Sequence, residues 1–231
     1  MKKASRCLSV LLLVLFMTTL LPQVSAMNSG FSTQPLTDRE TNLFISNVGL
    51  SLLTEEPSRK PIECFDVNTD QEIAIGQSDS NKKIVCVYSN NGVFQYGYKF
   101  NCSGRFGIEW DKQNLNIYFF RSDVIMSVSP DGAVLDIRNV ENTLNNNDYR
   151  NAFFHTTQRT VADKTFVIRN DMGILNYLAS SYSQLVTSDS TGETILYDVG
   201  STQLVRHLAG LVGSLIAVFL AAIIIKRMFI S

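Results

Sequence analysis

IECFDVNTDQEIAIGQ, residues 62–77, and KKIVCVYSNNGVFQYGY, residues 82–98, form the stretch that decides the fold of this chain. Apolar runs alternate here with two turns, one around Asp70 and one around Gly92. Short runs rich in β-branched and aromatic residues and bounded by Asp, Asn or Gly are typical of strands. The stretch therefore predicts four short strands joined by turns.

The pattern occurs twice more, in FGIEWDKQNLNIYFF with SDVIMSVSPDGAVLDIR (residues 106–138) and in TFVIRNDMGILNYLAS with SQLVTSDSTGETILYDV (residues 165–199). The turns of these copies contain Asp111 and Gly132, then Asp171 and Gly192. Repeated four-strand units stack their sheets face to face. We expect an all-β fold with three four-stranded antiparallel, blade-like repeats within residues 62–200.

The spacing of the copies indicates one insertion. Gly92 and Gly132 are 40 residues apart, whereas Gly132 and Gly192 are 60 residues apart. A propeller blade takes about 40 to 50 residues, so the second interval contains about twenty extra residues. These are ENTLNNNDYRNAFFH, residues 141–155, a stretch too polar for a core strand. TTQRTVADKTFVIR, residues 156–169, is predicted to form a hairpin that leads into the third copy.

The copies resemble NHL-type and related six-bladed β-propeller repeats. The matching features are the Asp turn before Ile-Ala-Ile or Asn-Ile-Tyr, and the Asn-Gly, Asp-Gly or Thr-Gly turn before the last strand. The resemblance covers residues 62–198 and implies a binding platform, with an enzyme at the central channel in some members. Closed propellers have about four to eight blades. Three copies therefore imply an open or partial β-propeller, or a ring completed by a second chain.

Residues 1–26 have the zones of a secretory signal peptide in the usual order. A basic start with Lys2, Lys3 and Arg6 precedes the apolar run CLSVLLLVLFMTTLL and the small-residue ending Val24-Ser25-Ala26. We expect cleavage after Ala26, and an uncleaved membrane anchor is the alternative.

Residues 27–61 are predicted to form a short helix and a linker. Thr37 followed by Glu40 fits a capping box, and LSLL (residues 50–53) resembles an extra strand. Pro57 and Pro61 mark a hinge into the first copy. We expect this segment to cover the first sheet as a lid or plug, because an uncovered terminal repeat would expose an apolar face. A loose stalk is the alternative.

The C-terminal region contains LAGLVGSLIAVFLAAIII, residues 208–225, which is uncharged throughout. At 1.5 Å per residue this stretch spans about 27 Å, close to the hydrocarbon thickness of about 30 Å. Lys226 and Arg227 follow it, whereas only Arg206 directly precedes it, so the C-terminus is predicted to be cytoplasmic. We expect a transmembrane helix with a basic stop-transfer end over residues 206–227. The chain would then be a single-pass, bacterial-type protein of the cell membrane, with its N-terminus outside.

The predicted extracytoplasmic part carries an excess of acidic residues. All 21 Asp and Glu residues lie between residues 27 and 205, together with 14 Lys and Arg residues, so the net charge there is near −7. Nucleic acid and anionic lipid are both repelled by such a charge. The sequence therefore indicates no nucleic-acid partner. Anchoring by the helix, a second copy of the chain and a neighbouring membrane protein remain as expected interactions.

Three cysteines remain after cleavage: Cys64, Cys86 and Cys102. In the strand pattern Cys64 and Cys86 lie on strands one and three of a single copy, about two strand spacings apart, which is too far for a disulfide. We expect buried free thiols. Cys102 is the candidate for an intermolecular bond or a reactive thiol.

Residues for catalysis or cofactor binding are scarce. The chain has two histidines, and we expect His155 to lie on the surface of the polar insertion. Asp66, Asn68 and Asp70 place oxygen ligands at alternate positions, as calcium loops do. The sixth and twelfth positions of this string, Gln71 and Gln77, depart from the calcium-loop pattern, and an Asp turn bonded to backbone amides is the alternative. We predict no catalytic residue and no cofactor.

Alternating aromatic residues, Phe94, Tyr96, Tyr98 and Phe100, are expected to fill the core between sheets, with an exposed binding platform as the alternative. Together the observations predict a membrane-anchored extracytoplasmic binding or assembly module of undetermined ligand. The alternative is a membrane-tethered hydrolase or lyase that acts on an extracellular polymer. A pocket joining Glu109, Asp111, Tyr118 and Asp123 would favour that alternative.

Overall fold

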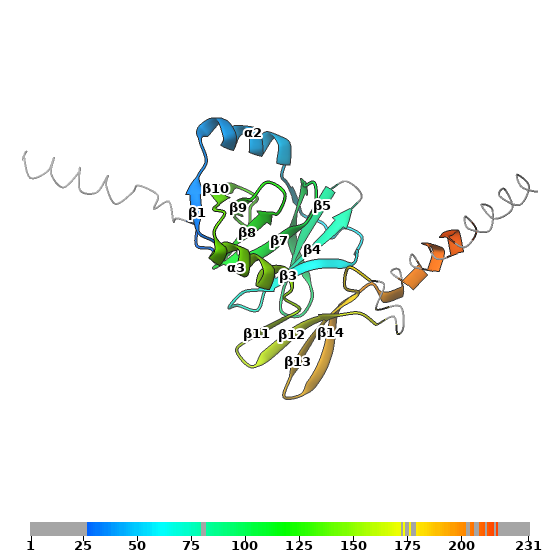
Figure 1. The fold of residues 1–231 in the computed structure, drawn as a ribbon. Helices are drawn as coiled ribbons and strands as arrows, with labels where there is room; N and C mark the ends of the chain where they lie inside the picture. Colours follow the sequence, from blue (N-terminus) through cyan, green and yellow to red (C-terminus); the bar gives the residue numbers. More distant parts are fainter. Residues whose placement is uncertain are drawn as a thin grey trace, which may run out of the picture.

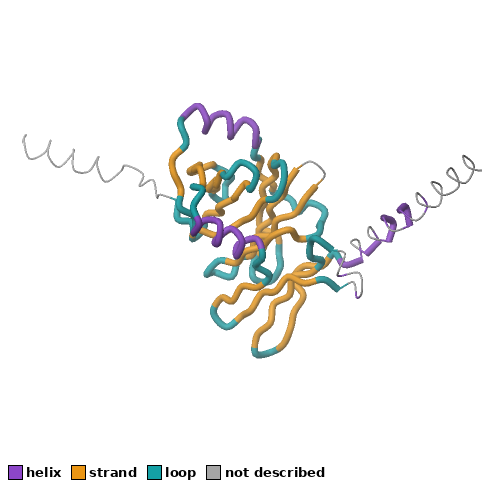
Figure 2. Tube along the Cα trace, in the orientation of Figure 1, coloured by secondary structure: helices purple, strands orange, loops and turns teal. Residues whose placement is uncertain are grey.

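The computed structural model describes residues 27–216, except positions 80, 81, 172, 174, 175, 177, 178, 202, 203, 206, 207, 211 and 215. The fold is mostly β and contains three antiparallel sheets, as the repeats predicted (Figure 1). Figure 2 shows the strands in orange and the helices in purple; helices α2 (Asp38–Val48) and α3 (Leu144–Phe154) flank the sheets, and further helical residues lie between positions 200 and 216.

The first copy forms the first sheet, with consecutive strands as antiparallel neighbours in the order β2-β6-β5-β4-β3. Gln71 and Gly92, in the predicted turns, have φ angles of 62° and 75°. Such left-handed backbone reverses the chain within a few residues. The strands are β2 (Ser51–Leu53), β3 (Ile62–Val67), β4 (Ile73–Asp79), β5 (Lys82–Tyr88) and β6 (Phe94–Asn101).

The second copy forms the second sheet in the same way, in the order β1-β10-β9-β8-β7. Lys112 and Gly132 have φ angles of 59° and 85° and occupy the turns equivalent to those of the first copy. The strands are β1 (Thr33–Pro35), β7 (Phe106–Asp111), β8 (Asn114–Phe119), β9 (Val124–Val128) and β10 (Val134–Val140).

The third sheet differs from the predicted third copy. Its order is β11-β12-β13-β14, with β11 (Gln158–Val161), β12 (Lys164–Arg169), β13 (Gln184–Asp189) and β14 (Gly192–Asp198). The predicted hairpin at residues 156–169 is confirmed, but it supplies the first two strands itself. The first turn is therefore at Ala162, with a φ of 53°, and the assignment of this turn to Asp171 was wrong. The described residues of the run predicted as a second strand lie outside the strands; they are Gly173, Asn176, Ala179 and Ser180.

The N-terminal segment joins two sheets. The predicted capping box is confirmed, because the Thr37 hydroxyl accepts a hydrogen bond from the Glu40 amide while Glu40 accepts one from the Thr37 amide. The predicted strand at residues 50–53 is present as β2, which pairs with β6, while β1 pairs with β10 of the second sheet. The Phe44 ring of α2 meets the Phe119 ring edge-on with centroids 5.0 Å apart. The segment thus extends two sheets and closes their junction, whereas a lid over the first sheet alone was expected.

The first sheet lies between the other two and is buried on both faces. One core cluster joins it to the second sheet and includes Tyr98, Phe100, Phe106 and Ile117. Tyr98 and Phe100 therefore fill the core, as predicted. A separate cluster joins the first sheet to the third, and its members include Ile62, Phe65, Ile75, Cys86, Phe166, Leu185 and Tyr197.

Helix α3 covers the outer face of the second sheet. Tyr149, Phe153 and Phe154 of α3 pack with Phe31 against Tyr118. The predicted polar insertion is thus a helix with one aromatic face.

The predicted signal peptide, residues 1–26, lies outside the described residues, as does the C-terminal part of the predicted transmembrane helix, residues 217–227. Among the helices that the structure describes, none is both long enough and apolar enough to cross a membrane.

Candidate functional site

The first strands of the three sheets meet at one carboxylate. Asp66 of β3 accepts a hydrogen bond from the Trp110 amide of β7, with N···O of 2.9 Å, and another from Arg159 Nε of β11, at 2.6 Å. The Asp66 side chain retains 12% of its exposure. Both carboxylate oxygens of this candidate metal ligand therefore bind groups from neighbouring sheets.

Asn68 and Asp70, the other candidate metal ligands, lie in the turn between β3 and β4. Asn68 Oδ1 accepts hydrogen bonds from the amides of Asp70, at 3.0 Å, and Glu72, at 2.8 Å. A side-chain oxygen that binds backbone amides two and four residues later stabilises a turn. Within the described residues, no three Asp, Glu, His or Cys side chains are grouped as metal ligands.

Each of the carboxylates considered for a hydrolase or lyase accepts a hydrogen bond that holds the fold together. Glu109 Oε2 accepts a hydrogen bond from the Tyr149 hydroxyl at 2.7 Å, and Asp111 accepts one from the Asn28 amide at 2.8 Å. Asp123 accepts one from the Tyr118 hydroxyl, also at 2.7 Å. These bonds attach α3 and the N-terminal segment to the second sheet and stabilise the β8–β9 turn.

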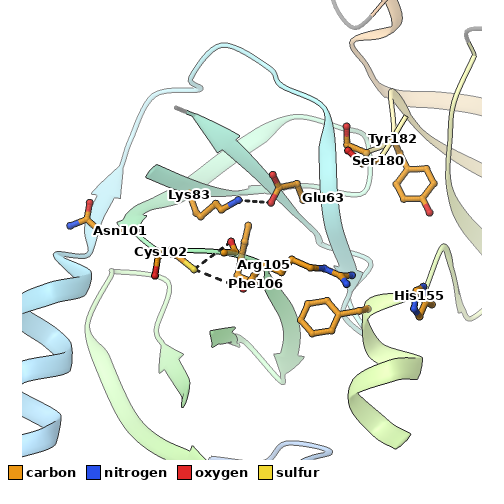
Figure 3. Close-up of a pocket in the computed structure, with 13 residues that line it drawn as sticks. Glu63, Lys83, Asn101, Cys102, Arg105, Phe106, His155, Ser180 and Tyr182 are labelled. Atoms are coloured by element: carbon orange, nitrogen blue, oxygen red, sulfur yellow. Dashed lines mark hydrogen bonds and ion pairs between the residues drawn. The ribbon is translucent and has the colours of Figure 1, made fainter. Parts of the chain in front are cut away.

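A groove of about 1180 Å³ lies where the first sheet, the β6–β7 loop, the end of α3 and the segment before β13 meet (Figure 3). In Figure 3, Asn101 and Cys102 lie on one side and His155 and Tyr182 on the other. Its described lining consists of Glu63, Lys83, Asn101, Cys102, Ser103, Gly104, Arg105, Phe106, Phe154, His155, Ser180, Ser181 and Tyr182.

An ion pair lies within the groove. Lys83 Nζ on β5 is 2.8 Å from Glu63 Oε2 on β3, and Ser78 also bonds to both side chains. The Lys83 ammonium lies 5.4 Å from the centroid of the Phe106 ring. Lys83 therefore already has an anionic partner, which lowers its capacity to bind a second anion.

Arg105 has a different environment. Its guanidinium lies 4.4 Å from the centroid of the Phe154 ring, a favourable cation–π distance, and Arg105 is exposed. The described residues provide no carboxylate in an ion pair with Arg105. A positive charge oriented by an aromatic ring and lacking an acidic partner is available to a ligand.

Cys102 lies at the junction of this groove and a second pocket of about 470 Å³, which α2 and the β8–β9 turn line. Burial raises the pKa of the Cys102 thiol, while nearby Lys83 opposes the rise. A raised pKa decreases the thiolate fraction and therefore the reactivity. Cys64 and Cys86 are free, as expected, with β4 between their strands, and Cys102 forms no disulfide within the chain.

Sequence reasoning missed the groove, because its lining comes from five separate segments. His155 is exposed, as predicted, but it also lines the groove. One sequence signal for the groove was available, the polar segment Asn101-Cys102-Ser103-Gly104-Arg105. This segment connects two predicted sheets, so it had to lie where their strands end.

Comparison with known proteins finds no family model that matches this chain and no matching curated protein.

Proposed function

We propose that this chain is a membrane-anchored extracytoplasmic binding or assembly module built as a partial β-propeller. The support is the arrangement of three four-strand units: β3 contacts both β7 and β11, so the first strands lie together, and each unit continues outward in chain order. A shared inner edge with the later strands outside is the arrangement of propeller blades. The predicted signal peptide supports export, and the C-terminal apolar stretch supports anchoring.

The observation that carries the binding role is the groove with Arg105, which forms no ion pair with any described residue. It combines a positive charge with aromatic side chains and hydroxyl groups, which suits recognition. A glycoside hydrolase would typically need two carboxylates beside the substrate. The described lining of this groove contains one, Glu63, which is paired with Lys83. We therefore favour binding over the hydrolase or lyase alternative and assign no reaction to the groove.

Among partners, we favour a neighbouring membrane protein over a second copy. A second chain that completed the ring would have to pack against the outer face of the second sheet. Helix α3 already covers that face through Tyr149, Phe153 and Phe154. Displacing these rings would expose apolar surface at a cost of about 25 cal/mol per Å².

Orientation is tested by labelling intact cells, with any outer envelope removed, using an amine-reactive reagent that does not cross membranes. Lys82, Lys99 and Lys164 should be labelled without permeabilisation. Labelling that requires permeabilised cells would refute the extracytoplasmic location.

The binding role is tested by photo-crosslinking the full chain in its native membrane. A photo-reactive residue replaces Ser103 in the groove, and the control replaces Thr191, an exposed residue of the β13–β14 turn. We expect a discrete adduct from position 103 and none from position 191. Equal adduct formation at both positions, or none at either, would contradict binding at the groove.

A further inference from the structure

We propose that the groove binds an acidic peptide segment of a partner protein, with a carboxylate of that segment on Arg105. This inference rests on the proposed binding function and names the chemistry of its ligand. The Arg105 guanidinium lies 4.4 Å from the centroid of the Phe154 ring and has no carboxylate in an ion pair among the described residues. An oriented guanidinium presents paired N–H donors that match a carboxylate.

The other groups of the groove suit a peptide. Ser103 and Tyr182 offer hydroxyl groups, and Phe106 and Phe154 contribute apolar surface. The volume of about 1180 Å³ slightly exceeds that of most small-molecule sites. The ligand expected from this lining carries carboxylates together with an aromatic or aliphatic side chain.

The distribution of charge selects a peptide over a lipid surface. Tyr182 lines the groove, and the carbonyl of the adjacent Ser183 accepts a hydrogen bond from the Val199 amide. Val199 is nine residues before the apolar stretch, so the groove lies near the segment that leads into the predicted anchor. An anionic bilayer presents negative charge over the whole area that faces the module, and the net charge near −7 opposes that approach. A short acidic segment contacts only the groove, and salt screens its repulsion from exposed charges that lie more than about 10 Å away.

Glu63 limits the number of carboxylates that the groove accepts. Because Lys83 is paired with Glu63, Arg105 is the cation with free capacity among the described residues of the groove. We therefore expect one dominant charge contact, so a single substitution should reveal it.

The test uses the full chain in phosphatidylcholine nanodiscs and a fluorescein-labelled peptide of three Glu-Phe pairs, with binding measured by fluorescence anisotropy. Peptides of three Gln-Phe and three Lys-Phe pairs, and empty nanodiscs, are the probe controls. The glutamate peptide should bind more tightly than the glutamine and lysine peptides. Arg105→Gln should weaken its binding about fivefold, as for one solvent-exposed ion pair, and Arg105→Lys should restore part of the loss.

Arg39→Gln on α2 is the matched control, because Arg39 is also exposed and its loss changes the net charge equally. We expect no change in affinity for this variant. Equal binding of the glutamate and glutamine peptides, or equal effects of the Arg105 and Arg39 variants, would overturn the proposal. Loss of peptide binding in phosphatidylserine-rich nanodiscs but not in phosphatidylcholine nanodiscs would instead assign the groove to lipid headgroups and overturn it as well.

The proposed function can fail separately. If the peptide does not bind while the lysines still label from outside and position 103 still gives its specific adduct, the acidic-peptide ligand is wrong and the binding module stands. If the labelling or the adduct fails, the module itself is wrong.

Discussion

Replacing Asp66 by Asn should weaken the contact between the three sheets and lower the free energy of unfolding, while the size of the side chain stays nearly the same. Asp66 Oδ2 accepts from the Trp110 amide and Oδ1 accepts from Arg159 Nε, at 2.9 and 2.6 Å. Asn provides one oxygen instead of two, so one of these donors loses its acceptor. Arg159 also loses its ionic partner.

The expected cost is about 2 kcal/mol of unfolding free energy. A charge-assisted hydrogen bond contributes about 1.5–3 kcal/mol, and a broken buried ion pair costs about 3–5 kcal/mol. The Arg159 side chain keeps 30% of its exposure, so water recovers part of its solvation and the lower range applies. Arg159→Gln should cost a similar amount. The double variant should cost less than the sum of the two single variants.

Urea unfolding of the detergent-solubilised chain provides the assay, with fluorescence of Trp110, the sole tryptophan, as the signal. The matched control is Arg169→Gln, because Arg169 pairs with Glu193 at 3.1 Å while both side chains are largely exposed. That substitution should cost at most about 0.5 kcal/mol. The reasoning would be refuted if Asp66→Asn cost no more than the control, or if the effects of the Asp66 and Arg159 substitutions were additive.

Three further predictions address α3, the buried thiols and the groove. Gly107→Ala should cost about 1–3 kcal/mol in the same urea assay, because its Cβ would lie 2.1 Å from Phe153, and adding Phe153→Leu should recover part of the loss. Burial raises the pKa of Cys86 to about 12, so above about pH 9 the folded thiol keeps its proton while the unfolded thiol loses it. The free energy of unfolding should therefore fall from about pH 9 upward, and it should fall less steeply in Cys86→Ala. Identical slopes in the two proteins would contradict this. Cys102 should react with iodoacetamide at pH 8 more slowly than free cysteine, because burial raises its pKa; a faster rate, measured by mass spectrometry, would show an activated thiol.

Part of this organisation could be predicted from sequence because turn chemistry is local. The turns at Gly92 and Gly132 and the capping box at Thr37 depend on residues within four positions of each other. The third sheet was misassigned for the same reason. A run beginning at Ile174 had the composition of a strand, whereas the turn at Ala162 carried no glycine and was marked only by its left-handed backbone.

The groove and the Asp66 contact could not be predicted in this way. Arg159 is 93 positions from Asp66, and no local pattern relates them. The aromatic face of α3 was hidden in an Asn-rich segment, since its three rings are meaningful only opposite the outer face of the second sheet.

The sequence by itself determined the first two repeated units with their tight turns, the hairpin that begins the third sheet and the apolar stretches near both ends, because each depends on neighbouring residues and their hydrophobic pattern. Only the tertiary structure decided the order in which the sheets stack, the use of Asp66 as a link between three strands, and the position of Arg105 without an ion pair to any carboxylate in the described part of the chain. These features arise when segments far apart in the chain bury their apolar faces together. The way these segments pack then decides which charged side chains at the sheet edges form ion pairs and which can contact a ligand.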